Sequence, residues 1–240
     1  LLLGMGLNWW REHHNAHHAR PNQEGYDPDA EIPVLALSAE QAARARGLSR
    51  WLCKRQTFLT PVMASLQVFE LHRGTAWFLL SRRTRGRSIE SVLFVAHVVL
   101  YLALVVMSLG VAHGLLFLLV QRIAAGWYLN IIFGTNHTGM PVLNEAQRMD
   151  FVEQQVSTAR NVLIPAWLAF LFGGLHLQIE HHLFPTMPRN QLKRAQPVVK
   201  AFCQQRGMPY QETGFVEAYH DIFVHLWRMS RLVPAGRRLS

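Results

Sequence analysis

The sequence predicts an all-α integral membrane protein, built from a transmembrane helical hairpin, interfacial helices and a cytoplasmic cap that carries clustered histidines. Half of the 240 residues are apolar, yet lysine and arginine outnumber aspartate and glutamate by 24 to 15. This combination is typical of membrane proteins, whose basic residues flank the spans and meet anionic head groups on the cytoplasmic side. The basic residues border apolar runs instead of alternating with aromatic residues, so we expect no nucleic-acid partner.

The first segment, Leu1–Leu7, has the sequence LLLGMGL and is predicted to be the tail of an upstream transmembrane helix. It has neither a basic n-region nor a small-residue cleavage site, so it does not have the pattern of a signal peptide. The chain thus begins inside an apolar stretch. We therefore expect residues 1–240 to be the C-terminal part of a single domain that is truncated at its N-terminus.

Two segments precede the predicted hairpin. Asp27–Arg50 is expected to form a loop followed by a polar helix, with Pro28 and Pro33 as helix breakers. Phe58–Leu71 is apolar but short and is interrupted by polar side chains. A helix that lies in the membrane interface fits this pattern better than a helix that crosses the bilayer.

The hairpin is predicted over residues 92–133. Val92–Leu109 is almost free of polar groups, and at about 1.5 Å per residue it is long enough to cross a bilayer core. Leu115–Phe133 forms a second apolar run, and the short Gly110–Gly114 stretch separates the two. Arg122 interrupts the second run, and an arginine at this depth must reach the interface or face protein.

The distribution of arginine predicts the orientation of the hairpin. Four arginines lie just before the first run, whereas the turn between the runs contains neither lysine nor arginine. By the positive-inside rule, both open ends of the hairpin are cytoplasmic. Val162–Leu175 is too short to span and is expected to lie along the membrane, and residues 185–240 are expected to form a polar, basic cytoplasmic segment.

Histidine is the unusual residue of this chain, which contains 13 of them. One cluster has the spacing H-x-x-H-H, and a second, QIEHH, places a glutamine and two histidines at the same offsets. On an α-helix, offsets of three and four residues share one face, so each trio can converge on a metal. A single histidine follows the hairpin and completes the candidate set, which is His14, His17, His18, His137, Gln178, His181 and His182.

The donor types limit the choice of metal. Several imidazoles with few thiolates suit iron, copper or zinc, and Cys53 and Cys203 lack the CxxC spacing of a thiolate site. Zinc is filled by four ligands or fewer, and this chain offers more, so two metal ions are the better count. On the predicted topology, all three histidine-bearing segments lie at the cytoplasmic surface of the membrane.

The motifs HNAHH, NHTG and GGLHLQIEHHLFPTMPR, arranged around a membrane hairpin, resemble the membrane fatty acid desaturase family. Glutamine at the first position of the last box resembles its front-end branch, of which the delta-5 and delta-6 enzymes are typical. The resemblance implies that the six histidines named above are catalytic iron ligands, and that Gln178 is a weaker ligand or a hydrogen-bonding neighbour. Such enzymes also need an upstream H-x-x-x-H box, which is missing here, so we expect this segment alone to be inactive.

The resemblance further implies a di-iron, O2-dependent desaturase that introduces a cis double bond into a long acyl chain carried by a lipid or by coenzyme A. Electrons would come from NAD(P)H through cytochrome b5 or ferredoxin. Two alternatives stay open from the sequence. A membrane hydroxylase or alkane monooxygenase shares the histidine-rich plan, and a non-catalytic membrane relative would explain the missing first box.

Overall fold

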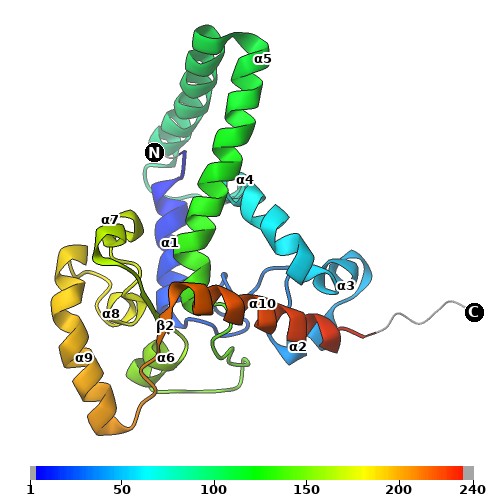
Figure 1. Ribbon diagram of the computed structural model, residues 1–240. Coiled ribbons are helices and arrows are strands. Elements are labelled where there is room, and N and C mark those ends of the chain that lie inside the picture. Colours follow the sequence, from blue (N-terminus) through cyan, green and yellow to red (C-terminus); the bar gives the residue numbers. More distant parts are fainter. Residues whose placement is uncertain (1–3, 235–240) are drawn as a thin grey trace, which may run out of the picture. The chain divides into compact units, whose positions relative to one another are not determined.

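The computed structural model describes residues 4–234, which divide between two compact units (Figure 1). The first unit comprises Leu1–Asn15 and Pro61–Asn130, and the second comprises Ala16–Thr60 and Ile131–Ser240. Three helices run from one unit into the other, namely α1 (Leu7–Ala19), α4 (Gln56–Ser81) and α5 (Arg87–His137).

The hairpin is the main element of the first unit. In α5, Gly110 has φ 72° and ψ 170°, a conformation that breaks the helix into two arms. Figure 1 shows the arms doubling back on one another, and the guanidinium of Arg122 lies 5.4 Å from the ring centroid of Tyr101 on the other arm. The predicted Gly110–Gly114 turn is therefore too long, because the second arm is helical again directly after Gly110.

The surface of α5 is almost entirely apolar and uncovered. Within residues 4–234, α5 is the helix that is long and apolar enough to cross a membrane, and only 6% of its most apolar window is buried. Water does not tolerate such a large continuous apolar surface, whereas the hydrocarbon core of a bilayer does.

The remainder of the first unit packs against α5. α4 has 26 residues, so the prediction of a short helix over Phe58–Leu71 was wrong at both ends. A Cβ on Gly126 would lie 2.3 Å from the carbonyl oxygen of Ala64, which shows how closely α5 approaches α4. The predicted helix tail over Leu1–Leu7 stays a prediction: its first three residues lie outside the described part of the chain, and α1 begins at Leu7.

The second unit consists of short helices around a small parallel strand pair, in which Asn161 pairs with Glu212. The all-α prediction did not include this pair. The segment expected as a loop and a polar helix contains two short helices, and the segment after residue 185 contains two longer ones within the described residues. The elements are α2 (Ala39–Arg44), α3 (Gly47–Cys53), α6 (Phe151–Ser157), β1 (Asn161–Leu163), η1 (Ala166–Leu168), α7 (Ala169–Phe172), α8 (Gln178–Leu183), η2 (Arg189–Gln191), α9 (Leu192–Arg206), β2 (Glu212–Gly214) and α10 (Phe215–Leu232).

Two small apolar clusters position the helices that carry the histidines. Val156, Ile179 and Cys203 pack together and join α6, α8 and α9. Phe172 and Leu175 pack against Ile132 near the end of α5. The predicted interfacial helix over Val162–Leu175 is instead divided among β1, η1 and α7, because Pro165 and the left-handed Gly173 and Gly174 interrupt it.

Candidate metal centre

Three imidazoles from three different elements converge in the second unit. His17 lies on α1, His137 is the last residue of α5, and His182 lies on α8. One nitrogen from each ring lies within 4.8 Å of the others. His17 and His182 are buried, with exposed fractions of 4% and 0%. Segments that are 165 residues apart in the sequence, 17 to 182, therefore meet at one point.

Each of these rings is held through Nδ1 by an oxygen atom of the protein. His17 Nδ1 lies 2.9 Å from an Asp27 carboxylate oxygen, and His137 Nδ1 lies 3.0 Å from the Thr158 carbonyl oxygen. His182 Nδ1 lies 2.8 Å from Gln155 Oε1. The orientation of the Gln155 amide is fixed, because its nitrogen donates to the His18 carbonyl oxygen. All three Nδ1 atoms therefore carry the proton and act as donors.

That tautomer leaves a lone pair on each Nε2 atom, and these atoms face one another. The Nε2 atoms of His137 and His182 are only 3.0 Å apart. Two buried lone pairs at this distance repel unless a proton or a cation lies between them. The donor set therefore fits a metal ion, since imidazole nitrogen suits iron, copper and zinc.

The pKa of His182 is lowered, whereas the pKa of His17 is raised. Burial, together with the charge of neighbouring imidazolium groups, holds the pKa of His182 well below its ordinary value, so the ring stays neutral and able to bind metal. Burial also opposes protonation of His17, but the hydrogen bond to Asp27 and the charges of Asp27 and Asp29 outweigh it and raise its pKa. A carboxylate behind a histidine ligand raises the basicity of the ring and fixes its orientation.

A second pair of histidines adjoins the first group. The rings of His18 and His181 meet edge to face with centroids 4.7 Å apart, and His18 stacks on His182 at 4.3 Å. The sixth predicted histidine, His14, belongs to the first unit. It lies one helical turn before His18 on α1, so the two side chains project from the same face of that helix.

Gln178 is close to the histidine cluster, but it turns its amide nitrogen, and not its oxygen, toward the histidines. Gln178 Nε2 lies 3.0 Å from His137 Nε2, whereas Oε1 accepts a hydrogen bond of 3.0 Å from Asn136. The Asn136 amide is itself fixed, because its nitrogen also donates to the Ile132 and Leu175 carbonyls. An amide nitrogen has no lone pair for a metal, so this arrangement suits a hydrogen-bonding neighbour better than a ligand.

A buried carboxylic acid orients α8. In the sequence of α8, Glu180 lies between Gln178 and His181. Its carboxylate oxygens accept hydrogen bonds from Asn161 and Tyr210 at 2.8 and 2.7 Å. Asn161 Oδ1 also accepts a hydrogen bond from the Ile179 amide. Burial raises the pKa of Glu180. These contacts fix one side of a helix that has only six residues, and so they fix the direction of the histidines on its other side.

The supporting residues were not evident from the sequence. Asp27 lies in a segment expected to be a loop, where aspartate is common for other reasons. Gln155 precedes His182 by 27 residues and belongs to no motif. Nothing in their spacing indicates a contact with a metal ligand.

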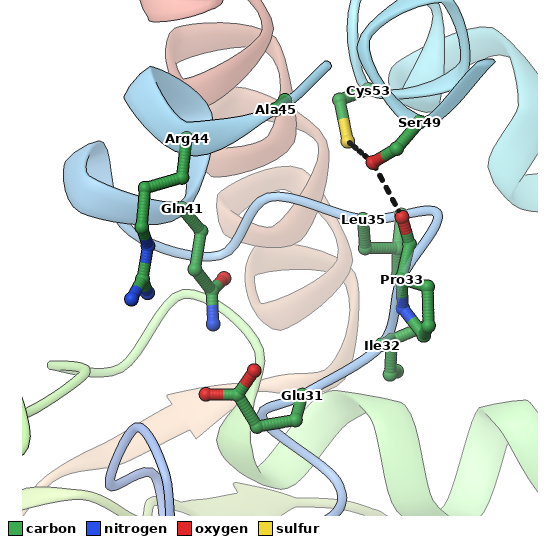
Figure 2. Close-up of a pocket in the computed structure, with 9 residues that line it drawn as sticks. All are labelled: Glu31, Ile32, Pro33, Leu35, Gln41, Arg44, Ala45, Ser49 and Cys53. Atoms are coloured by element: carbon green, nitrogen blue, oxygen red, sulfur yellow. Dashed lines mark hydrogen bonds between the residues drawn. The ribbon is translucent and has the colours of Figure 1, made fainter. Parts of the chain in front are cut away.

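A separate open cleft of about 310 Å³ lies between the Glu31–Leu35 loop and helices α2 and α3 (Figure 2). It contains none of the predicted site residues. Ser49 donates a hydrogen bond of 2.6 Å to the Pro33 carbonyl on its wall. Burial raises the pKa of the Cys53 thiol, which does not favour a reactive thiolate. The cleft therefore has no part in the candidate centre.

Comparisons with known proteins point to one family. The family model described as "Fatty acid desaturase" matches residues 1–214. An "Acyl-lipid 8-desaturase" of Rebecca salina is 32% identical over 90% of this chain and 49% of its own length. An "Acyl-lipid (9-3)-desaturase" of Physcomitrium patens is 31% identical over 89% of this chain and 42% of its own length.

A "Delta(5) fatty acid desaturase" of Caenorhabditis elegans is 31% identical over 92% of this chain and 54% of its own length. The chain thus spans about half the length of the curated relatives that it matches.

Proposed function

This chain belongs to the fatty acid desaturase family, in its front-end branch, and we propose that in the complete protein its histidines hold two iron ions for O2-dependent desaturation of a long acyl chain. The observation that carries the proposal is the geometry of His17, His137 and His182. Each ring donates through Nδ1 to the protein, and three Nε2 lone pairs are left to converge on one small buried space.

One iron ion would take His17, His137 and His182 as ligands. The second would take His18 and His181, with His14 added from the same face of α1. Gln178 would lie beside this iron ion as a polar neighbour of His137, with direct ligation of iron as the less favoured role. Further ligands would come from an H-x-x-x-H box in the rest of the protein. We therefore propose that the chain described here binds iron poorly and is inactive when separated from that box.

Iron with O2 supplies the oxidising power that breaks an unactivated methylene C–H bond, which no amino-acid side chain supplies. The chain contributes positioning and exclusion of water. Asp27, the Thr158 carbonyl and Gln155 hold the ligand rings in one tautomer. The apolar arms of α5 would cross the bilayer as a hairpin and provide a dry wall for the acyl chain.

The proposal extends to the setting of the reaction. The histidine clusters would lie on the cytoplasmic face of a multi-pass membrane protein, where cytochrome b5 or ferredoxin delivers electrons from NAD(P)H. The substrate would be an acyl-lipid or acyl-CoA. The names of the relatives support a front-end reaction, in which the new double bond lies between an existing one and the carboxyl end.

The test uses the full-length protein in detergent or nanodiscs. We expect His17→Asn and His182→Asn each to lose most of the bound iron, measured as iron per chain by mass spectrometry, and to form no unsaturated product from a defined fatty acid. His113→Asn is the matched control, since His113 is an exposed histidine near the turn of the hairpin. Iron content that stays at the wild-type level in both site variants would overturn the proposal.

The same assay separates the alternative reactions. A desaturase product is lighter than its substrate by two hydrogens, whereas a hydroxylase product gains an oxygen atom. Mass spectrometry of the product decides between them. A full-length protein that binds iron yet makes neither product would favour a non-catalytic relative.

A further inference from the structure

Helix α10 follows the segment that the family match covers, yet it contacts Arg160, a residue that holds the backbone around His137. The match ends at Gly214, and α10 begins at Phe215. The pairing of β2 with β1 places the start of α10 beside the segment that carries Arg160. Asp221, in the second turn of α10, forms an ion pair of 3.1 Å with Arg160 Nη1.

Arg160 donates hydrogen bonds to backbone carbonyls on both sides of His137. Its Nε donates to the Thr135 carbonyl at 2.7 Å, and its Nη2 donates to the Thr138 carbonyl at 2.6 Å. Its own amide donates to the Asn136 carbonyl at 3.0 Å. These three bonds fix the last turn of α5, and with it the direction from which the His137 ring enters the cluster.

The Arg160 guanidinium depends on the Asp221 carboxylate because it is buried away from water. The Arg160 side chain is 1% exposed, whereas Asp221 is 40% exposed. A buried cation is costly unless an opposite charge and hydrogen bonds compensate for it. Without the carboxylate, Arg160 would be expected to turn toward solvent and release the carbonyls that it holds.

We propose that Asp221 of α10 is a positioning residue of the metal centre, which acts through Arg160 on the backbone around His137. The inference rests on the proposed function, because it takes His137 to be a ligand. This role would make α10 necessary for the geometry of the site, although Asp221 contacts no predicted ligand side chain among the described residues.

The experiment titrates Co²⁺ into the metal-free full-length protein and records the dissociation constant and the d–d absorption bands. We expect Asp221→Ala to weaken Co²⁺ binding about tenfold, the lower end of the range for residues that support a metal ligand. The bands at saturation should also shift, because His137 binds in an altered orientation. A variant that is merely less stable would lower the amount of folded protein but leave the bands in place.

Three further variants make the result specific. Glu40→Ala removes an exposed carboxylate of α2 and should bind Co²⁺ as the wild type does. Asp221→Glu keeps the carboxylate and should restore most of the affinity. Arg160→Lys keeps the buried positive charge but loses the hydrogen bonds that Nε and Nη2 donate to the two carbonyls. It should therefore weaken Co²⁺ binding and shift the absorption bands, and it tests the inference even if Asp221→Ala does not fold.

The outcomes separate this inference from the proposed function. If His182→Asn abolishes Co²⁺ binding while Asp221→Ala and Arg160→Lys match the wild type in affinity and bands, the role of α10 is overturned and the metal site stands. If His182→Asn binds Co²⁺ as the wild type does, the proposed function itself fails.

Discussion

His17 and His182 face the same small space but differ in their affinity for a proton. His182 is enclosed among other imidazoles, and burial holds its pKa well below the ordinary 6.5. His17 is just as enclosed, but the carboxylate of Asp27 behind it raises its pKa. A metal ion must displace a proton more readily held by His17 than by His182, so metal binding should weaken on acidification first through His17.

The lowered pKa of His182 predicts a pH dependence of stability in the metal-free protein. Below pH 6.5 the unfolded chain takes up a proton at His182, whereas the folded chain does not until the lowered pKa is reached. The unfolded state thus binds more protons in this window, and the free energy of unfolding falls as the pH falls. We expect the melting temperature to drop between pH 7.5 and pH 5.5, and to drop less in His182→Asn.

The test depends on the difference in melting temperature between the wild type and His182→Asn, because other groups titrate in the same pH range. His17 contributes in the opposite direction: its stabilisation is present below pH 6.5 and is lost as the pH rises through its raised pKa. His113→Asn, at an exposed position near the hairpin turn, is the control variant and its curve should match that of the wild type. Identical curves for His182→Asn and the wild type would contradict the assigned environment of His182.

At the scale of single elements, α5 depends on one backbone conformation. Gly110 adopts φ 72° and ψ 170°, a region that is open to glycine and strained for other residues. No atom lies within 4 Å of the position that a Cβ would take there. The need for glycine is therefore a matter of backbone conformation and not of space.

We expect Gly110→Ala to destabilise the hairpin by about 1–3 kcal/mol, the usual cost of holding a residue with a Cβ in this region. Gly114→Ala is the matched control. Its Cβ would meet Val105 at 3.4 Å, an ordinary contact, in a helical stretch where alanine is favoured. Melting temperatures in nanodiscs measure both. Equal losses for the two variants would mean that Gly110 does not set the turn.

The elements also show what the sequence could and could not predict. The histidines of α1 and α8 were found because helical spacing alone aligns them, and this spacing is local information. The short elements of the second unit were missed, since propensity says little about three-residue strands and single turns that tertiary contacts hold in place. Asp27 and Arg160 were missed for a related reason: each acts on a histidine that is distant in the sequence or belongs to another element.

At the scale of the whole molecule, the two units differ in the residues that they carry. The second unit holds five of the six predicted histidine ligands and is polar and basic, whereas the hairpin arms belong mostly to the first. A catalyst that acts on an acyl chain needs both kinds of surface. The arginines that precede the hairpin belong to the first unit as well, so the charge pattern predicts the orientation of the hairpin and not the division into units.

The positive-inside argument leads to a test of topology. In a protein whose native Cys53 and Cys203 are replaced by alanine, His113→Cys marks the turn end of the hairpin and Asn190→Cys marks η2, and both positions are exposed. In sealed vesicles with the cytoplasmic face outward, we expect an impermeant maleimide to label Asn190→Cys at once. His113→Cys should react only after detergent opens the vesicles. Labelling of both cysteines in intact vesicles would contradict a hairpin that crosses the bilayer, because then the two positions would share one side of the membrane.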